Sequence, residues 1–190
     1  MFRRGYDIRM SVQQTVVSPL TQTKYQVRLD FGKPGLKRMT DADVIIWVDS
    51  LGQFETMSVQ ACAVEDATII AADLTNRTAA AQWVLEHQVR LGRRVTIAVV
   101  AAGREGAFTS HDALAAGAVI DALATAGIDF TSPEAAVVCA AFEGLQKAVG
   151  HLFTASVVGQ EMIVAGEREK VVRASQVDTR TDVKVLRLAS

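Results

Sequence analysis

Three acids in this sequence stand where a parallel sheet would bring their carboxylates together. Asp49 ends the apolar run Asp43–Asp49, Glu105 lies in the loop after a later apolar run, and Asp112 falls in the first turn of the helix that this loop enters. Hard cations such as Mg²⁺ prefer carboxylate oxygens in proteins. The spacing therefore predicts a Mg²⁺ site formed by Asp49, Glu105 and Asp112, although an acid at a strand end or a helix start also has a purely structural explanation.

The sequence also predicts a phosphate-binding site beside these acids. Ser110 is a good N-cap, so the first amides of its helix would be free to bind an anion. Arg104 lies in the same loop, and its guanidinium group is able to bind a phosphate with two parallel hydrogen bonds. A cation, an anion-binding helix start and an arginine are the parts needed for metal-assisted phosphoryl transfer. The alternative is that Arg104 and Glu105 simply form a solvated loop.

Other catalytic motifs are missing from the sequence. It has no P-loop, no GxGxxG and no GxSxG. His87, His111 and His151 lack the spacing of metal ligands, and Cys62 and Cys139 form no CxxC pair. We therefore expect the two cysteines to be reduced thiols in a cytoplasmic protein.

The order of the elements indicates how these residues are positioned. Strands are expected at Tyr25–Asp30, Asp43–Asp49, Ala67–Ala72, Val95–Ala101 and Val183–Leu188, with a turn at Gly32–Gly35. Helices are expected at Gln53–Val64, Arg77–Arg90, His111–Ala126, Pro133–Val149, Ser156–Ala165 and Glu167–Ser175. Alternating strands and helices predict a three-layer α/β/α fold with a mainly parallel sheet, with Asp43–Asp49, Ala67–Ala72 and Val95–Ala101 as parallel neighbours. In such sheets ligands bind beyond the carboxyl ends of the strands.

Composition favours one domain at 24–190 after a flexible N-terminal arm at 1–23. The chain has 190 residues, of which 49% are hydrophobic and 54 are Ala or Val, and its net charge is −1. Residues 1–40 carry eight Lys/Arg and two Asp, but these are scattered and lack an aromatic platform, so no nucleic acid is expected as a partner. No apolar run is long enough to span a membrane. Exposed apolar surface on such a domain favours a homodimer.

Four segments resemble the 2-phosphosulfolactate phosphatase family. The strongest is AAGREGAFTSHDALAAGA (101–118), and the others are YQVRLDFGKPGLKRMTDADVIIWVDSL (25–51), DLTNRTAAAQWV (73–84) and ASVVGQEMIVAGEREKVVRASQVD (155–178). The resemblance implies Mg²⁺-dependent release of phosphate from 2-phosphosulfolactate, a step towards coenzyme M. It places Asp49, Asn76, Gly103, Glu105 and Asp112 at matching positions, so Asn76 and Gly103 join Arg104 and Ser110 as expected substrate-binding residues.

Departures from the family pattern keep a second function open. Only 17 residues separate Asp49 from Ala67, where family members have a long middle section, and His111 replaces an acid. The leading interpretation is a phosphatase acting on a small anionic phosphate ester. The alternative is a non-catalytic ligand-binding or assembly domain that keeps the fold. A third possibility is an isochorismatase-like cysteine hydrolase with Cys139 as the nucleophile, but no base is predicted near this thiol.

Overall fold

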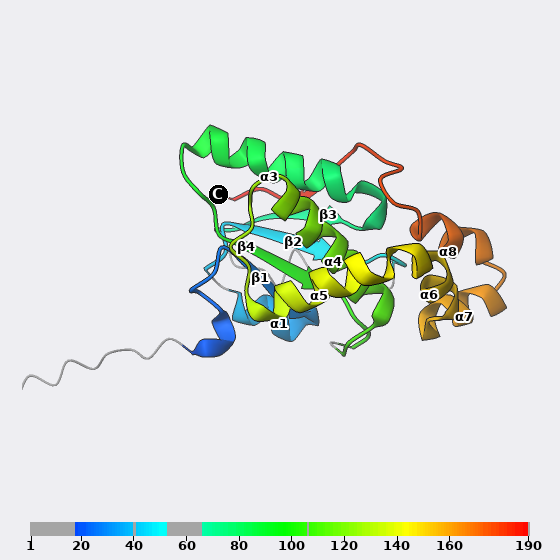
Figure 1. Ribbon diagram of the computed structural model, residues 1–190. Coiled ribbons are helices and arrows are strands. Elements are labelled where there is room, and N and C mark those ends of the chain that lie inside the picture. The colour runs from blue at the N-terminus through cyan, green and yellow to red at the C-terminus, as the bar shows by residue number, and fades with distance from the viewer. Residues whose placement is uncertain (1–17, 40, 53–65, 106, 190) are drawn as a thin grey trace, which may run out of the picture.

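Five strands form one sheet at the centre of the protein (Figure 1). The computed structural model describes residues 18–39, 41–52, 66–105 and 107–189. The strands lie in the order β1-β4-β2-β3-β5, with bounds β1 Val27–Phe31, β2 Val44–Val48, β3 Thr68–Ala72, β4 Ile97–Ala101 and β5 Lys184–Arg187. The expected α/β fold with a mainly parallel sheet is therefore confirmed.

Strand pairing follows the prediction from apolar runs. Strand β2 pairs in parallel with both β3 and β4, and β1 pairs in parallel with β4. Only β5 runs antiparallel, along β3. Every residue of β2 and β4 is buried, because both faces of these central strands are covered.

Helices flank the sheet. Their bounds are α1 Gly32–Arg38, α3 Arg77–Leu91, α4 Ser110–Thr125, α5 Pro133–Leu145, α6 Val149–Ala155, α7 Val157–Val164 and α8 Arg168–Ala174, with 3-10 turns η1 Pro19–Thr21, η2 Leu74–Asn76 and η3 Gln146–Ala148. One core cluster joins α3, α4 and α5 to one face of the sheet, whereas Leu36 and Met39 cover the other face. The strands β2 and β4 point towards the end of the molecule where α6, α7 and α8 gather (Figure 1).

Helix α4 lies at the centre of the helical layer. All residues from His111 to Ile120 are buried, although the sequence predicted one buried face. The helix packs on β4, α3, α5 and α6, and these contacts bury every residue from His111 to Ile120. Gly117 allows the close approach of α5, because a Cβ atom at this position would lie 2.1 Å from the carbonyl oxygen of Val138.

Two predicted elements differ in the structure. The segment Gly32–Gly35 begins helix α1 rather than forming a turn, since Leu36 and Met39 are buried against the sheet and Pro34 stands in the first turn, where no amide is needed. The helix expected to run from Pro133 to Val149 ends at Leu145 and is followed by η3 and a separate α6. Burial of Val149 and Phe153 accounts for the change of direction.

Other expectations fall on residues that the structure does not describe. The predicted helix Gln53–Val64 lies largely outside the described residues, and so does most of the predicted N-terminal arm, of which Ser18 caps η1. Among the described helices, none has the length and apolar character needed to cross a membrane.

Replacing Gly117 by Ala tests the close packing of α4 and α5. We expect Gly117→Ala to lower the free energy of unfolding by about 2–3 kcal/mol, because the added methyl group meets backbone atoms of α5. Gly144 in α5 is a matched control, since a Cβ atom there has nothing within 4 Å. Gly144→Ala should raise stability by about 0.5–1 kcal/mol through helix propensity. Urea unfolding measures both, and equal effects of the two changes would contradict the packing argument.

The amino end of β2 is tied to that of β4 through Asp43. This carboxylate accepts hydrogen bonds from Arg93 and from the Thr96 amide, and the Arg93 bond is the main reason that the pKa of Asp43 falls from 3.8 to about 2. A lowered pKa stabilises the fold above pH 4 and ceases to do so as the pH falls towards 2. We expect Asp43→Asn to cost about 1–2 kcal/mol at pH 7 and much less near pH 2. Urea unfolding at both pH values measures this, with Asp66→Asn, at an exposed turn, as the control.

Candidate functional site

The candidate site lies at the carboxyl ends of β2, β3 and β4. The chain passes from β2 to its neighbour β3 and then crosses back to β4 on the other side of β2. Parallel sheets bind ligands where the strand order reverses in this way. Two cavities lie at this edge of the sheet. Asp49 and Asn76 line one, and Arg104, Glu105 and Ser110 line the other, whereas Gly103 and Asp112 line neither.

The first, which we call the β2–β3 cavity, has a volume of about 190 Å³. Asp49 and Asp73, which follow β2 and β3, both line it. Arg180 and Lys184 from the C-terminal segment line it too, while Trp47, Ala71 and Leu186 contribute an apolar wall. Two carboxylates and two cations thus converge on one small hollow, a combination that suits a metal ion bound together with an anion.

Asn76 also lines the β2–β3 cavity, but its amide has structural partners. Its Oδ1 accepts from the Asp73 amide at 2.9 Å, while Asp73 accepts from the Thr75 amide at 2.7 Å, so the two residues form a capping box around η2. Asn76 Nδ2 donates to the Asp182 carbonyl at 2.9 Å. This predicted substrate-binding residue therefore fixes the loop after β3 against the C-terminal segment.

The second, which we call the α4 cavity, has a volume of about 510 Å³. Arg104, Glu105 and Ser110 line it together with His111 and residues Ser156–Val158 of α7 and its cap. Arg104 donates to both carboxylate oxygens of Glu161 at 2.8 and 3.1 Å. Ser110 is the first residue of α4 rather than its N-cap, which is Thr109. Glu105 thus lies in a different cavity from Asp49.

Asp112 connects the loops of the two cavities instead of lining either. Its side chain is 2% exposed. One carboxylate oxygen accepts from the Ser50 amide after β2 at 3.0 Å, and the other accepts from the Gly103 amide after β4 at 3.0 Å and from the Thr109 hydroxyl at 2.9 Å. Asp112 therefore holds the ends of two central strands against the start of α4.

Gly103 allows the backbone conformation of the loop after β4. Its φ is +62°, and a Cβ atom there would lie 2.1 Å from the Ala107 carbonyl oxygen. Arg104 and Ala107 exchange backbone hydrogen bonds of 3.1 and 2.8 Å, which make a tight turn with Glu105 at its tip in the left-handed region. Glycine at position 103 is thus explained by the close approach of the two strands of this turn.

His111 has unusual electrostatic surroundings. Its ring is 2% exposed and packs edge-on against Phe153, and its Nε2 lies 3.5 Å from Asp112 Oδ2. Burial lowers the pKa of His111, and the negative charge of Asp112 partly opposes this effect. Its Nδ1 is buried without a hydrogen-bond partner.

The predicted metal triad does not assemble as three ligands. Within the described part of the chain, only Asp121, Cys139 and Glu143 have ligand atoms that all lie within 4.8 Å of one another. Asp121 is already paired with Arg77. Burial, together with Glu143, raises the pKa of Cys139 to about 11, so its thiol stays protonated. The same shift disfavours Cys139 as a nucleophile.

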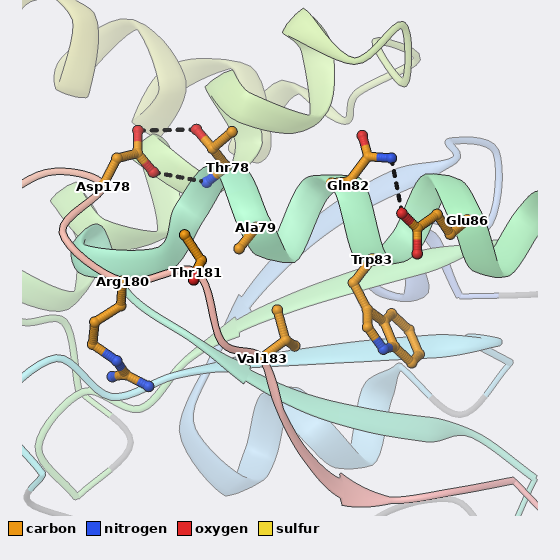
Figure 2. Close-up of a pocket in the computed structure, with 9 residues that line it drawn as sticks. All are labelled: Thr78, Ala79, Gln82, Trp83, Glu86, Asp178, Arg180, Thr181 and Val183. Carbon is orange, nitrogen blue, oxygen red and sulfur yellow. Dashed lines mark hydrogen bonds between the residues drawn. The ribbon is translucent and has the colours of Figure 1, made fainter.

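A further cavity, with a volume of about 670 Å³, lies between α3 and residues 178–183 (Figure 2). Trp83 and Val183 face it from opposite sides (Figure 2). Asp178 accepts from the Thr78 amide and hydroxyl, and Gln82 donates to Glu86, so polar groups on this wall bond to each other. Only Arg180 belongs to both this cavity and the β2–β3 cavity.

The chain is similar to one known protein family. A family model described as 2-phosphosulpholactate phosphatase matches residues 55–188, more than half of the 190 residues. The chain belongs to this family. The matched range covers Asp73, the loop after β4, and Arg180, but it begins after Asp49. No curated protein matches the chain.

The sequence pattern did not identify three charged residues of the β2–β3 cavity, which are Asp73, Arg180 and Lys184. Asp73 follows an apolar strand as Asp49 does, so the same signal identifies it. Arg180 and Lys184 carry no such signal, because they lie more than 100 residues further along the chain in a segment without motifs. The pairing of β5 with β3 brings Lys184 to the site, and a backbone hydrogen bond from Arg180 to Thr75 brings Arg180 there.

The role of Asp112 as a structural connection is testable. We expect Asp112→Asn to lower the free energy of unfolding by about 2–4 kcal/mol, because an amide NH₂ would face a buried backbone N–H at either Ser50 or Gly103. Urea unfolding measures the change, and Asp129→Asn, at an exposed position, is the control. Unchanged stability would show that the carboxylate is not needed to join the loops.

Proposed function

We propose that this protein is a Mg²⁺-dependent phosphatase that hydrolyses a small acidic phosphomonoester in the β2–β3 cavity. The observation that carries the proposal is the convergence of Asp49, Asp73, Arg180 and Lys184 on one hollow at the carboxyl edge of the sheet. Membership of the 2-phosphosulpholactate phosphatase family supports the same reaction class and makes 2-phosphosulfolactate the first substrate to test.

The residues present fit a magnesium ion. Asp49 and Asp73 offer hard oxygen ligands from neighbouring strand ends, and Mg²⁺ usually binds through one or two carboxylates while it keeps several waters. Asp73 uses one oxygen for Thr75, while its other oxygen lies 4.0 Å from Arg180. When bound, Mg²⁺ would neutralise charge on the phosphate and lower the pKa of a bound water.

The cations complete the proposed phosphate site. Arg180 is 46% exposed and donates to Asp182 at 2.6 and 3.0 Å, so its guanidinium group is held at the mouth of the cavity. Lys184 extends from β5 on the same side. Two positive charges beside two carboxylates bind a phosphate dianion and position it against the metal ligands. A water would attack the phosphorus atom from the side opposite the ester oxygen; the P–O ester bond would break, and the proton lost by the water would end on the leaving alcohol oxygen.

A non-catalytic function is favoured by one group of observations. Asp112, Gly103 and Asn76 are expected to contact substrate or metal in an active enzyme, yet each has bonds or packing that shape the loops. A family member that uses these residues for structure alone would bind a phosphate ester without hydrolysing it. Measurement of phosphate release distinguishes an active phosphatase from a protein that only binds the ester.

Phosphatase assays test the proposed reaction. With 2-phosphosulfolactate and an aryl phosphate we expect phosphate release that disappears with a chelator and returns with Mg²⁺. Asp49→Asn should lower kcat/KM by about 100-fold or more, because a neutral amide holds the cation poorly.

Asp129→Asn is the matched control, since Asp129 is exposed after α4 and lies outside both cavities. Its kcat/KM should equal that of the unchanged protein. Binding of the ester without phosphate release would support the ligand-binding alternative. Metal-dependent turnover that survives Asp49→Asn would show that the reaction occurs elsewhere.

A further inference from the structure

We infer that the outer side of helix α5 is an interface between two copies of this chain, which pack with their α5 helices antiparallel. Helix α5 lies beside α4 in the helical layer (Figure 1). Its outer side, which we call the α5 face, consists of six exposed residues: Pro133, Ala136, Val137, Ala140, Ala141 and Gly144. The inference does not depend on the proposed phosphatase reaction, because the α5 face shares no residue with the β2–β3 cavity or the α4 cavity.

Helix α5 is apolar on all sides, although only its inner side is buried. Ala135 and Phe142 are fully buried, and the helix packs there on α4 and β1. On the outer side, Val137 is 69% exposed. The sequence has no charged residue between Glu134 and Glu143, so this outer side has no charge over two helical turns. A helix that is apolar all round is normally covered on every side, and we therefore expect a partner on the α5 face.

A comparison with α3 and the charges around α5 limit the kind of partner. Helix α3 belongs to the same layer, and its solvent side carries polar residues such as Gln82 and Glu86. The lack of such residues is thus particular to α5. Helices that lie on membranes usually have Lys and Arg beside the apolar side, whereas Glu134 and Glu143 flank the α5 face and Lys147 follows it. A protein surface suits this face better than a membrane.

The shape of the α5 face fits a second copy of itself. Val137 and Gly144 lie two turns apart on the same side of the helix. A Cβ atom at Gly144 would have nothing within 4 Å, so there is open space beside this residue. A twofold axis between Ala140 and Ala141 would place Val137 of each copy in the space beside Gly144 of the partner subunit. Large residues would then face small ones, with alanines at the axis, which allows two helices to approach closely.

Charge favours the antiparallel arrangement. In this register Glu134 of one copy lies level with Lys147 of the partner subunit, so opposite charges meet at both ends of the interface. A parallel pair would set Glu134 against Glu134 and Lys147 against Lys147. One helix face from each copy makes a small interface, so we expect a weak dimer with a dissociation constant of about 10–100 μM.

Sedimentation velocity of the full chain, over concentrations that span this dissociation constant, tests the dimer. We expect Val137→Gln to weaken self-association by about 10-fold or more, because the same apolar contact is lost twice in each dimer. Val89→Gln is the matched control, since Val89 is an equally exposed valine (74%) on helix α3. This control should associate as the unchanged protein does.

Charge reversal tests the register. Glu134→Lys alone and Lys147→Glu alone should each weaken the dimer by about 5- to 10-fold, because like charges then meet at both ends. The double variant Glu134→Lys/Lys147→Glu restores opposite charges and should return the affinity to within about twofold of the unchanged protein. Glu169→Lys makes the same change in the first turn of α8 and should have no effect.

The substituted side chains are exposed, so every variant should fold, and circular dichroism checks this. A protein that stays monomeric at the highest concentration would overturn the inference. The same conclusion would follow from equal association of Val137→Gln and Val89→Gln, or from a double charge variant no tighter than either single one. Binding to phospholipid vesicles in place of self-association would assign the α5 face to a membrane and also overturn the dimer.

Discussion

The carboxylate of Asp112 is the contact on which the site edge of this protein depends. It is almost fully buried, yet it accepts hydrogen bonds from the loops after β2 and β4 and from Thr109, the N-cap residue of α4. Strand ends in a parallel sheet leave backbone amides that need acceptors once helices cover them. The buried carboxylate of Asp112 accepts hydrogen bonds from the amides that follow both β2 and β4. Asp112 therefore joins the ends of β2 and β4, and it lines neither of the two cavities at this edge.

Burial of α4 is the second constraint, and it follows from small side chains. Alanines and Gly117 allow α4 to approach the sheet, α3, α5 and α6 closely. A helix surrounded in this way has little freedom to rotate or slide. Its first turn, with Ser110, His111 and Asp112, is therefore held in a fixed position relative to the strand ends, as a binding site requires.

The two cavities differ in the way they gain charge. The β2–β3 cavity joins acids that follow strands to cations that arrive with the antiparallel β5. The α4 cavity is lined by the start of α4, by Arg104 and Glu105 and by the buried His111, whose pKa is lowered by burial. The family match, residues 55–188, includes the α4 cavity and Asp73, Arg180 and Lys184 of the β2–β3 cavity, but it begins after Asp49.

The sequence by itself determined the strands, most helices and the edge of the sheet where chemistry was expected. Uniformly apolar runs ending in Asp49 and Ala72 are sufficient for this, because a parallel strand is buried on both faces. Tertiary structure decided which acids meet. Asp49 and Asp112 were both expected at the site, but Asp112 is buried and accepts from backbone amides. Contacts of the C-terminal segment with β3 and with the loop after it bring Lys184 and Arg180 to the cavity that Asp49 lines. The local sequence pattern predicts the position of a residue within a helix or strand. The contacts that its side chain makes depend on residues far apart in the sequence, so no local pattern predicts them.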